Sequence, residues 1–155
     1  YDVVNKWSEK NLEEIFRNYG EMKDAKKIAR LICKERKTSL FETTRQLADF
    51  IARCRRTKKT IHPATQVFQA IRICVNNELE HLKAGLEGSL KILGTGARIV
   101  VISYHSLEDR IVKNFMRTKE QLKVLTKKPV VPDEIEKSIN KSARSAKLRA
   151  AEVLF

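Results

Sequence analysis

Polar side chains follow directly after the most hydrophobic run of this sequence. Residues 99–103 contain four consecutive β-branched residues, which predicts a strand buried on both faces in the middle of an α/β sheet. Ligands of open α/β sheets bind beyond the carboxyl ends of the strands. We therefore predict a functional edge after this strand, formed by His105, Ser106, Glu108, Asp109 and Arg110.

The same residues also fit the beginning of a helix. Apolar residues repeat every four positions from Leu107, and Ser106 with Asp109 three residues later resembles a capping box. Glu108 and Asp109 would favour a helix N-terminus, so structural roles stay open for both acids and for Ser106. Because helix initiation does not call for a histidine, His105 is the stronger functional candidate. A hydrolytic Ser-His pair is not favoured, since consecutive residues leaving a strand point to opposite faces.

The composition indicates a globular protein with a polyanionic partner. The 155 residues carry a formal net charge of +13, which favours nucleic acid as the partner. No apolar run approaches the roughly 20 residues that span a bilayer. Cys33, Cys54 and Cys74 are about twenty residues apart and lack histidines at ligand spacing, so we predict reduced core cysteines in a cytoplasmic protein and no metal site.

Three amphipathic helices are predicted in the first 55 residues, each too short to be stable alone. Ser8 is the predicted N-cap of the first, and Thr43 with Gln46 forms a capping box for the third. A run of cations follows, Arg53, Arg55, Arg56, Lys58 and Lys59, for which a phosphate-contacting loop and a solvated helix end are the alternatives. A helix-turn-helix over residues 24–55 is a further alternative, although no helix with several base-reading residues stands out.

The second half of the sequence alternates helices and strands, which indicates an α/β fold. A long helix opens at residues 61–65 and carries an apolar stripe of Phe68, Ile71, Val75, Leu79, Leu82 and Leu86. After the central strand and its helix, we predict a short strand at 122–126, a brief helix at 134–139 and a final strand at 148–155. The connection between the last two strands leaves an antiparallel pairing open.

Three motifs, in order, resemble those of the MraW-type family, bacterial S-adenosylmethionine-dependent methyltransferases that modify the N4 amine of cytosine in ribosomal RNA. They are residues 101–113 (VISYHSLEDRIVK), residues 62–65 (HPAT) followed by 68–72 (FQAIR), and residues 144–149 (RSAKLR). Trp7 and Ser8 with the helix after them also resemble the family, so the likeness covers about 7–154. Two departures each remove a cation: Gln66 stands where the family often has Arg, and residues 140–143 lack an expected Pro-Arg-Ser.

The resemblance implies a fragment, because family members are about twice this length. Residues 1–60 would be a helical insertion that engages RNA, and 61–155 the C-terminal part of a Rossmann-like methyltransferase sheet whose first strands are missing. The cofactor site of the family lies in the half before Trp7. We therefore expect S-adenosylmethionine to serve the full-length enzyme and none to bind this fragment, which is expected to be inactive. The exposed sheet edge predicts a homodimer or a domain-swapped oligomer.

The resemblance also assigns contacts with 16S ribosomal RNA. The substrate-binding residues would be His105, Ser106, Glu108, Arg110, His62, Thr65 and Gln69. Beside the run that ends at Lys59, the phosphate contacts would include Arg72, Arg144, Lys147 and Arg149. The catalytic residues are expected mostly in the missing half. A non-enzymatic basic RNA-binding module is the alternative function.

Overall fold

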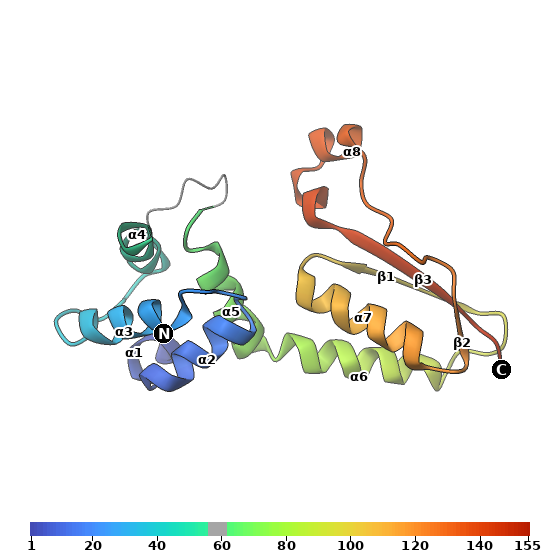
Figure 1. Ribbon diagram of the computed structural model, residues 1–155, viewed down its shortest axis with the longest axis horizontal. Helices are drawn as coiled ribbons and strands as arrows, with labels where there is room; N and C mark the ends of the chain where they lie inside the picture. The colour runs from blue at the N-terminus through green and yellow to red at the C-terminus, as the bar shows by residue number, and fades with distance from the viewer. Residues whose placement is uncertain (56–61) are drawn as a thin grey trace. The chain divides into compact units, whose positions relative to one another are not determined.

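A computed structural model describes residues 1–55 and 62–155, and the chain divides into two compact units, Tyr1–Glu78 and Leu79–Phe155. Each unit is described by itself (Figure 1). The helices of the first unit are α1 (Asp2–Lys6), α2 (Glu9–Asn18), α3 (Ala25–Glu35), α4 (Thr44–Cys54) and α5 (Thr65–Asn76). The predicted boundary between an RNA-binding insertion (1–60) and a methyltransferase part (61–155) comes from the family resemblance, and it stays a prediction.

The helices of the first unit bury their apolar stripes against one another, as the sequence predicts. Leu12, Phe16, Ile28, Ile32 and Ile51 are all completely buried in this shared core. The predicted caps are also confirmed. The backbone N of Asn11 donates to Ser8 Oγ at 3.1 Å, and the capping box of α4 is complete, with Gln46 N donating to Thr43 Oγ1 at 3.1 Å.

Gly20 lets the end of α2 approach the beginning of α5. A Cβ at Gly20 would lie 2.7 Å from the carbonyl oxygen of Phe16 and 3.0 Å from that of Gln66. Both are backbone atoms, which cannot move aside as a flexible side chain would. The close contact of these two helices therefore requires glycine at this position.

The long helix predicted from residue 61 is wrong, because the segment forms two helices. Asn77 adopts the left-handed conformation (φ 50°) and ends α5, and α6 (Glu78–Leu90) follows. Asparagine tolerates this conformation better than most residues and is a common helix terminator. The expected apolar stripe also differs: Val67 and Ile73 are buried, whereas Val75 is 63% exposed.

The second unit contains a small antiparallel sheet with strand order β1-β3-β2. Its further elements are β1 (Arg98–Ser103), α7 (Ser106–Thr118), β2 (Leu122–Val124), α8 (Glu134–Ile139), the 3₁₀ helix η1 (Lys141–Ser145) and β3 (Lys147–Val153). Since β1 and β2 both run antiparallel to β3, they are parallel to each other and are connected through α7. The predicted α/β class, the brief helix at 134–139 and both late strands are confirmed.

One face of this sheet is covered and the other is not. Helix α7 packs on the face that carries Ile99, Ala151 and Val153, which are buried (Figure 1). On the opposite face Val100 is 57% exposed and Ile102 is 52% exposed. The prediction of a strand buried on both faces is therefore wrong for this chain, because no described element covers the second face.

The three cysteines are free and half-buried, and pack on or within the helical core. Burial raises the pKa of the thiols of Cys54 and Cys74, so these side chains behave as apolar core groups. No helix among residues 1–55 and 62–155 is long and apolar enough to cross a membrane.

Candidate functional site

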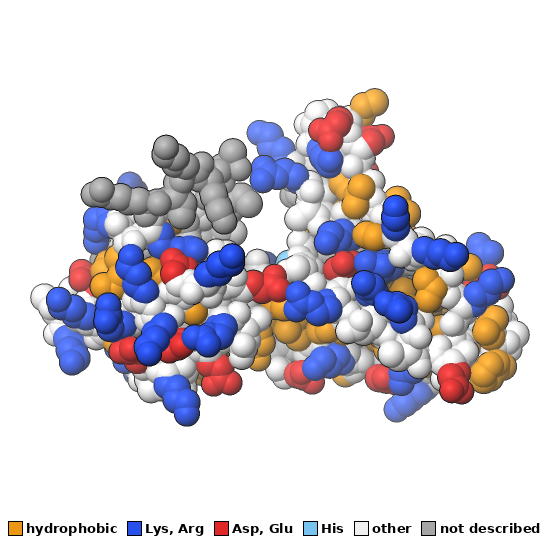
Figure 2. Space-filling view, viewed as in Figure 1, with side chains coloured by type: hydrophobic (Ala, Val, Ile, Leu, Met, Phe, Trp, Pro, Cys, Tyr) orange, Lys and Arg blue, Asp and Glu red, His pale blue; other side chains and the backbone are white. Residues whose placement is uncertain are grey.

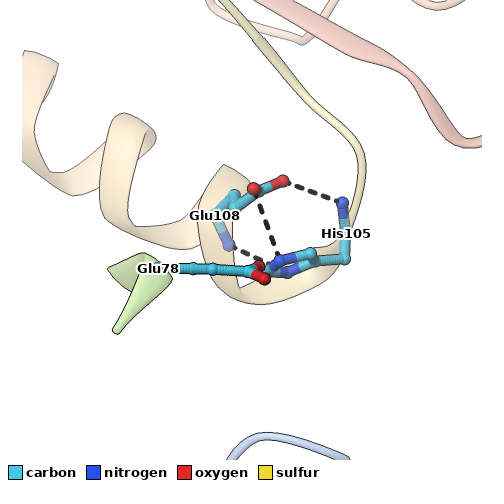
Figure 3. A group of neighbouring side chains, drawn as sticks. All are labelled: Glu78, His105 and Glu108. Carbon is cyan, nitrogen blue, oxygen red and sulfur yellow. Dashed lines mark hydrogen bonds and ion pairs between the residues drawn. The ribbon is translucent and has the colours of Figure 1, made fainter. Parts of the chain in front are cut away.

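The turn between β1 and α7 is organised by His105, which is the N-cap of the helix. The backbone N of Glu108 donates to His105 Nδ1 at 3.3 Å. In return Glu108 Oε2 accepts a hydrogen bond from the backbone N of His105 at 3.3 Å (Figure 3). It also accepts one from the backbone N of Tyr104 at 2.8 Å. This is a complete capping box in which an imidazole nitrogen replaces the usual hydroxyl or carboxylate oxygen.

The expected capping box of Ser106 and Asp109 is therefore wrong by one residue. The expectation that a histidine has no part in starting the helix is wrong for the same reason. The His105 side chain is mostly buried, and its Nε2 lies 3.4 Å from Glu108 Oε1. Because Nδ1 accepts from the backbone N of Glu108, this nitrogen cannot also take a proton from Ser106.

Asp109 forms the main ion pair of this edge. Its Oδ1 accepts from Arg149 Nε at 2.7 Å and its Oδ2 from Arg149 Nη2 at 3.2 Å, while Lys147 Nζ lies 3.6 Å from Oδ2. The hydrogen bonds from Arg149, and then its charge and that of Lys147, hold the pKa of the Asp109 carboxyl below its usual range against the opposing effect of burial. The pair ties the first turn of α7 to β3.

Arg149, one of the predicted phosphate contacts, lies beside the first turn of α7. It is 6% exposed, and its guanidinium is bidentate to Asp109. Lys147 is half-buried beside the same carboxylate, whereas Arg144 is exposed on η1. Near this edge Ser103 Oγ is buried without a hydrogen-bond partner among the described residues.

In the first unit, Arg55 connects the end of α4 with the beginning of α5. Its guanidinium donates to Asp24 Oδ2 at 2.8 Å, to the carbonyl of Pro63 at 2.7 Å and to Gln66 Oε1 at 3.0 Å. The side chain is 11% exposed, and these bonds stabilise the fold. Its phosphate contact stays a prediction. Arg53 is exposed, and Arg56, Lys58 and Lys59 lie outside the described residues.

The other predicted contacts of the first unit lie along α5 and in the turn before it. His62 Nδ1 accepts from the backbone N of Ala64 at 3.2 Å, and Gln69 Nε2 donates to the carbonyl of Tyr19 at 3.2 Å. Arg72 forms a two-pronged ion pair with Glu78, at 2.7 and 3.1 Å. Thr65 is exposed on the first turn of the helix. These residues share one helix and the turn before it, and most of them have partners within the unit.

The structure also shows a basic cavity that the sequence patterns do not predict. It has a volume of about 420 Å³ and is lined by cations of α7 and of the segment after β2, including Lys113, Arg117 and Lys127. The signal available in the sequence was the i, i+4 spacing of Lys113 and Arg117 on the predicted helix. The partner segment could not be located without the sheet register.

The described residues do not fit a bound S-adenosylmethionine. A nucleoside cofactor in this type of sheet needs a glycine-rich turn after a strand and a carboxylate available to the ribose hydroxyls. The left-handed glycine of the second unit, Gly96, precedes β1. Glu108 and Asp109, the acids after β1, are already bonded to the helix N-terminus and to Arg149.

The structure gives the class of the fold, and comparison with known proteins gives the family. A crossover of strand, helix and strand with the last strand inserted antiparallel places the chain among α/β proteins. Residues 1–154 match the MraW methylase family, and the chain belongs to that family.

Its curated relatives are named "Ribosomal RNA small subunit methyltransferase H". The protein from Carboxydothermus hydrogenoformans is 49% identical over 173 residues, which cover 99% of this chain and 56% of the relative. That from Caldicellulosiruptor saccharolyticus is 48% identical, over 98% of this chain and 56% of the relative. The protein from Trichormus variabilis is 50% identical, over 97% of this chain and 50% of the relative. The chain thus spans about half the length of the curated relatives it matches.

Proposed function

We propose that this chain is the C-terminal half of an S-adenosylmethionine-dependent methyltransferase that modifies the N4 amine of a cytidine in 16S ribosomal RNA. The observation that carries the proposal is the match to the methylase family over residues 1–154, at 49% identity to a relative named for ribosomal RNA methylation. Residues 1–60 would engage the RNA, and 61–155 would complete the methyltransferase sheet.

The sheet geometry supports a missing neighbour on one side. In the sheet of the described residues β1 is an edge strand, and its outer face carries the exposed Val100 and Ile102. In folded proteins, an unpaired strand edge is normally protected and an apolar sheet face is normally packed against another part of the protein or a partner. We propose that earlier strands of the full-length enzyme provide it, and that a second copy does so when the chain is alone.

In the full-length enzyme the cofactor supplies the methyl group, and the residues of this chain hold the RNA. The exocyclic amine of cytosine is a weak nucleophile, so the enzyme must fix it in line for displacement. A base in structured RNA must also leave its stack to reach such a site. The His105 and Glu108 capping box makes the turn after β1 rigid, which suits a wall against the flipped base with Ser106 and Arg110 beside it.

Calorimetry with the isolated chain tests whether the cofactor site lies elsewhere. We expect no heat of binding when S-adenosylmethionine is titrated into the chain. The matched control is a full-length relative, such as the Carboxydothermus hydrogenoformans protein, in which binding is expected. Micromolar binding to the chain alone would contradict the proposal that it lacks the cofactor half.

A chimaera tests the reaction itself. The N-terminal half of the Carboxydothermus hydrogenoformans relative, joined to this chain, should transfer a labelled methyl group to small-subunit ribosomal RNA. Mass spectrometry of the digested RNA should identify N4-methylcytidine. A methyl group found only on another atom or another nucleotide would overturn the N4 assignment, and no transfer by a folded, cofactor-binding chimaera would overturn the function.

The net charge of +13 favours one alternative, a basic RNA-binding module without enzymatic activity. Both proposals predict RNA binding by the isolated chain. They differ in the chimaera, where only the methyltransferase proposal predicts methyl transfer. A binding preference for duplex DNA over a ribosomal RNA hairpin would instead favour the helix-turn-helix alternative.

A further inference from the structure

The basic cavity of the second unit lies between α7 and the β2 and β3 strands. Its volume of about 420 Å³ is within the range of small-ligand sites, roughly 300–1,000 Å³. Figure 2 shows several lysine and arginine side chains gathered over this part of the unit. All titratable residues that line the cavity are basic, namely Lys113, Arg117, Lys127 and Arg149.

Three of these cations are not used by the fold. Lys113 and Arg117 lie one turn apart on α7, and Lys127 follows β2. All three side chains are exposed, and none has a hydrogen bond or ion pair with a described residue. Because these side chains have no hydrogen-bond or ion-pair partner in the described part of the chain, they are available to an anion, and an oxyanion such as a phosphate can accept from several of them at once.

The remaining lining adds apolar contact and a fixed charge. Met116 is almost completely buried at the floor, and Val124 is half-buried beside it. Arg149 uses Nε and Nη2 for Asp109, which leaves three of its five N–H groups. Thr126 Oγ1 accepts from the backbone N of Ala150 at 2.9 Å and holds the segment that carries Lys127 against β3. The cavity is therefore built on rigid elements.

We propose that this cavity binds one nucleotide of single-stranded RNA. Lys113, Arg117 and Lys127 hold the phosphate, and the base lies against Met116 and Val124. Thioether and guanidinium groups are both suitable partners for a flat aromatic ring, and the size of the cavity suits one nucleotide. The choice of RNA as the source of the nucleotide rests on the proposed function, whereas the ligand chemistry rests on the cavity alone.

A pair of charge-matched variants tests the site in the isolated chain, without cofactor. Lys113→Gln with Arg117→Gln removes two cations of the cavity. Lys91→Gln with Lys123→Gln is the control: it removes two exposed cations of the same unit that do not line the cavity, one of them on β2. Affinity for a fluorescent eight-nucleotide RNA is measured by anisotropy against salt concentration, and thermal unfolding verifies that both variants fold.

We expect the cavity variant to weaken RNA binding by about tenfold or more. It should lower the salt slope by at most about 0.7, because the three cations share one phosphate. The control should lose less than about threefold through its general charge effect. Equal losses in the two variants would overturn the proposal. This readout does not depend on methylation, so an inactive chimaera with a functioning cavity would count against the proposed function only.

Three competitors distinguish the source and class of the ligand. Cytidine 5′-monophosphate should displace the RNA from the chain and shift the methyl NMR signals of Val124. Inorganic phosphate that displaces the RNA equally well would overturn the role of the base and leave a simple anion site. The proposal that the nucleotide comes from RNA would be overturned by one further result. In that result, the monophosphate shifts the NMR signals of Val124 and an unlabelled RNA of the same sequence does not.

Discussion

The two units of this chain bury their apolar residues to different extents. In the first unit, the helices enclose one core, and Leu12, Phe16 and Ile28 are completely buried. In the second, α7 covers one face of the sheet, while Val100 and Ile102 on the other face are more than half exposed. The first unit satisfies its own hydrophobic pattern, and the second carries a pattern that needs further cover.

A hydrophobic pattern indicates the environment for which a segment is suited, and a single chain need not supply all of that environment. The run of β-branched residues in β1 is typical of a strand with both faces buried. The described residues supply that environment on one face only. The pattern of β1 therefore fits the larger sheet that we propose for the full-length enzyme, while the helical stripes of the first unit already fit the chain by itself.

The largest expected effect is in the helical core. Phe16→Ala should destabilise the first unit by about 3–5 kcal/mol, because it removes a completely buried aromatic side chain and leaves a cavity. Trp7, the single tryptophan of the chain, packs on this core and reports its unfolding by fluorescence. The matched change on the sheet, Ile102→Ala, should cost less than about 1 kcal/mol by hydrogen exchange. Similar losses for both would contradict the comparison.

The next effect concerns the buried ion pair of the second unit. Asp109→Asn leaves Arg149 buried without its counter-charge and should cost about 3 kcal/mol. Hydrogen exchange of β1 and β3 measures this unit separately. The control is Glu152→Gln, which breaks the exposed cross-strand pair with Arg98 and should cost less than about 1 kcal/mol.

The stability of the second unit should depend on pH through the Asp109 and Arg149 ion pair. The pKa of the Asp109 carboxyl is lowered in the fold, so its contribution is fully present above the unfolded pKa of about 3.9. It is lost as pH falls through the lower folded pKa. The wild-type unit should therefore lose more stability on acidification below about pH 4 than Asp109→Asn does. Parallel pH profiles would show that the pair does not link stability to pH.

The open side of the sheet predicts self-association of the chain. Multi-angle light scattering at high concentration should detect dimers or larger species, since β1 offers an unpaired edge and an apolar face. Ile102→Lys should weaken the association by about tenfold, because a lysine on an edge strand opposes pairing. Lys91→Gln, an exposed change outside the sheet, is the control and should change little. A wild-type chain that stays monomeric would remove the support for an incomplete sheet.

Much of the fold could be predicted from the sequence, and the reasons for the failures are physical. The stripes and caps of α2 and α4 depend on residues within a few positions, so periodicity and capping rules identify them. The break at Asn77 depends on a single left-handed residue inside an apolar repeat. The antiparallel insertion of β3 depends on pairing between distant segments, which local patterns do not determine.

The candidate site was predicted in position more than in role. The turn after β1 is polar and organised, but the sequence did not show that His105 accepts from Glu108 or that Arg149 is buried against Asp109. The first depends on the rotamer of a residue three positions away, and the second on a partner forty residues away. The burial and the fold partners of Arg55 and Arg149 could not be predicted from the sequence, nor could the cavity beside Lys113 and Arg117.

The smallest expected effect compares the two helix caps. Thr43→Ala and His105→Ala should each cost about 1 kcal/mol, because each leaves a backbone N–H of the first helical turn without its side-chain partner. Trp7 fluorescence should detect the first change and hydrogen exchange of α7 the second. His105→Asn is the informative control, since asparagine is a strong N-cap and should restore stability.

The same variant separates capping from substrate contact. If His105 only caps α7, the chimaera carrying His105→Asn should methylate ribosomal RNA at the wild-type rate. If the ring also forms a wall of the base site, as we propose, His105→Asn should retain stability and lose at least about tenfold in turnover at saturating cofactor. Full activity of this stable variant would assign His105 to the fold alone.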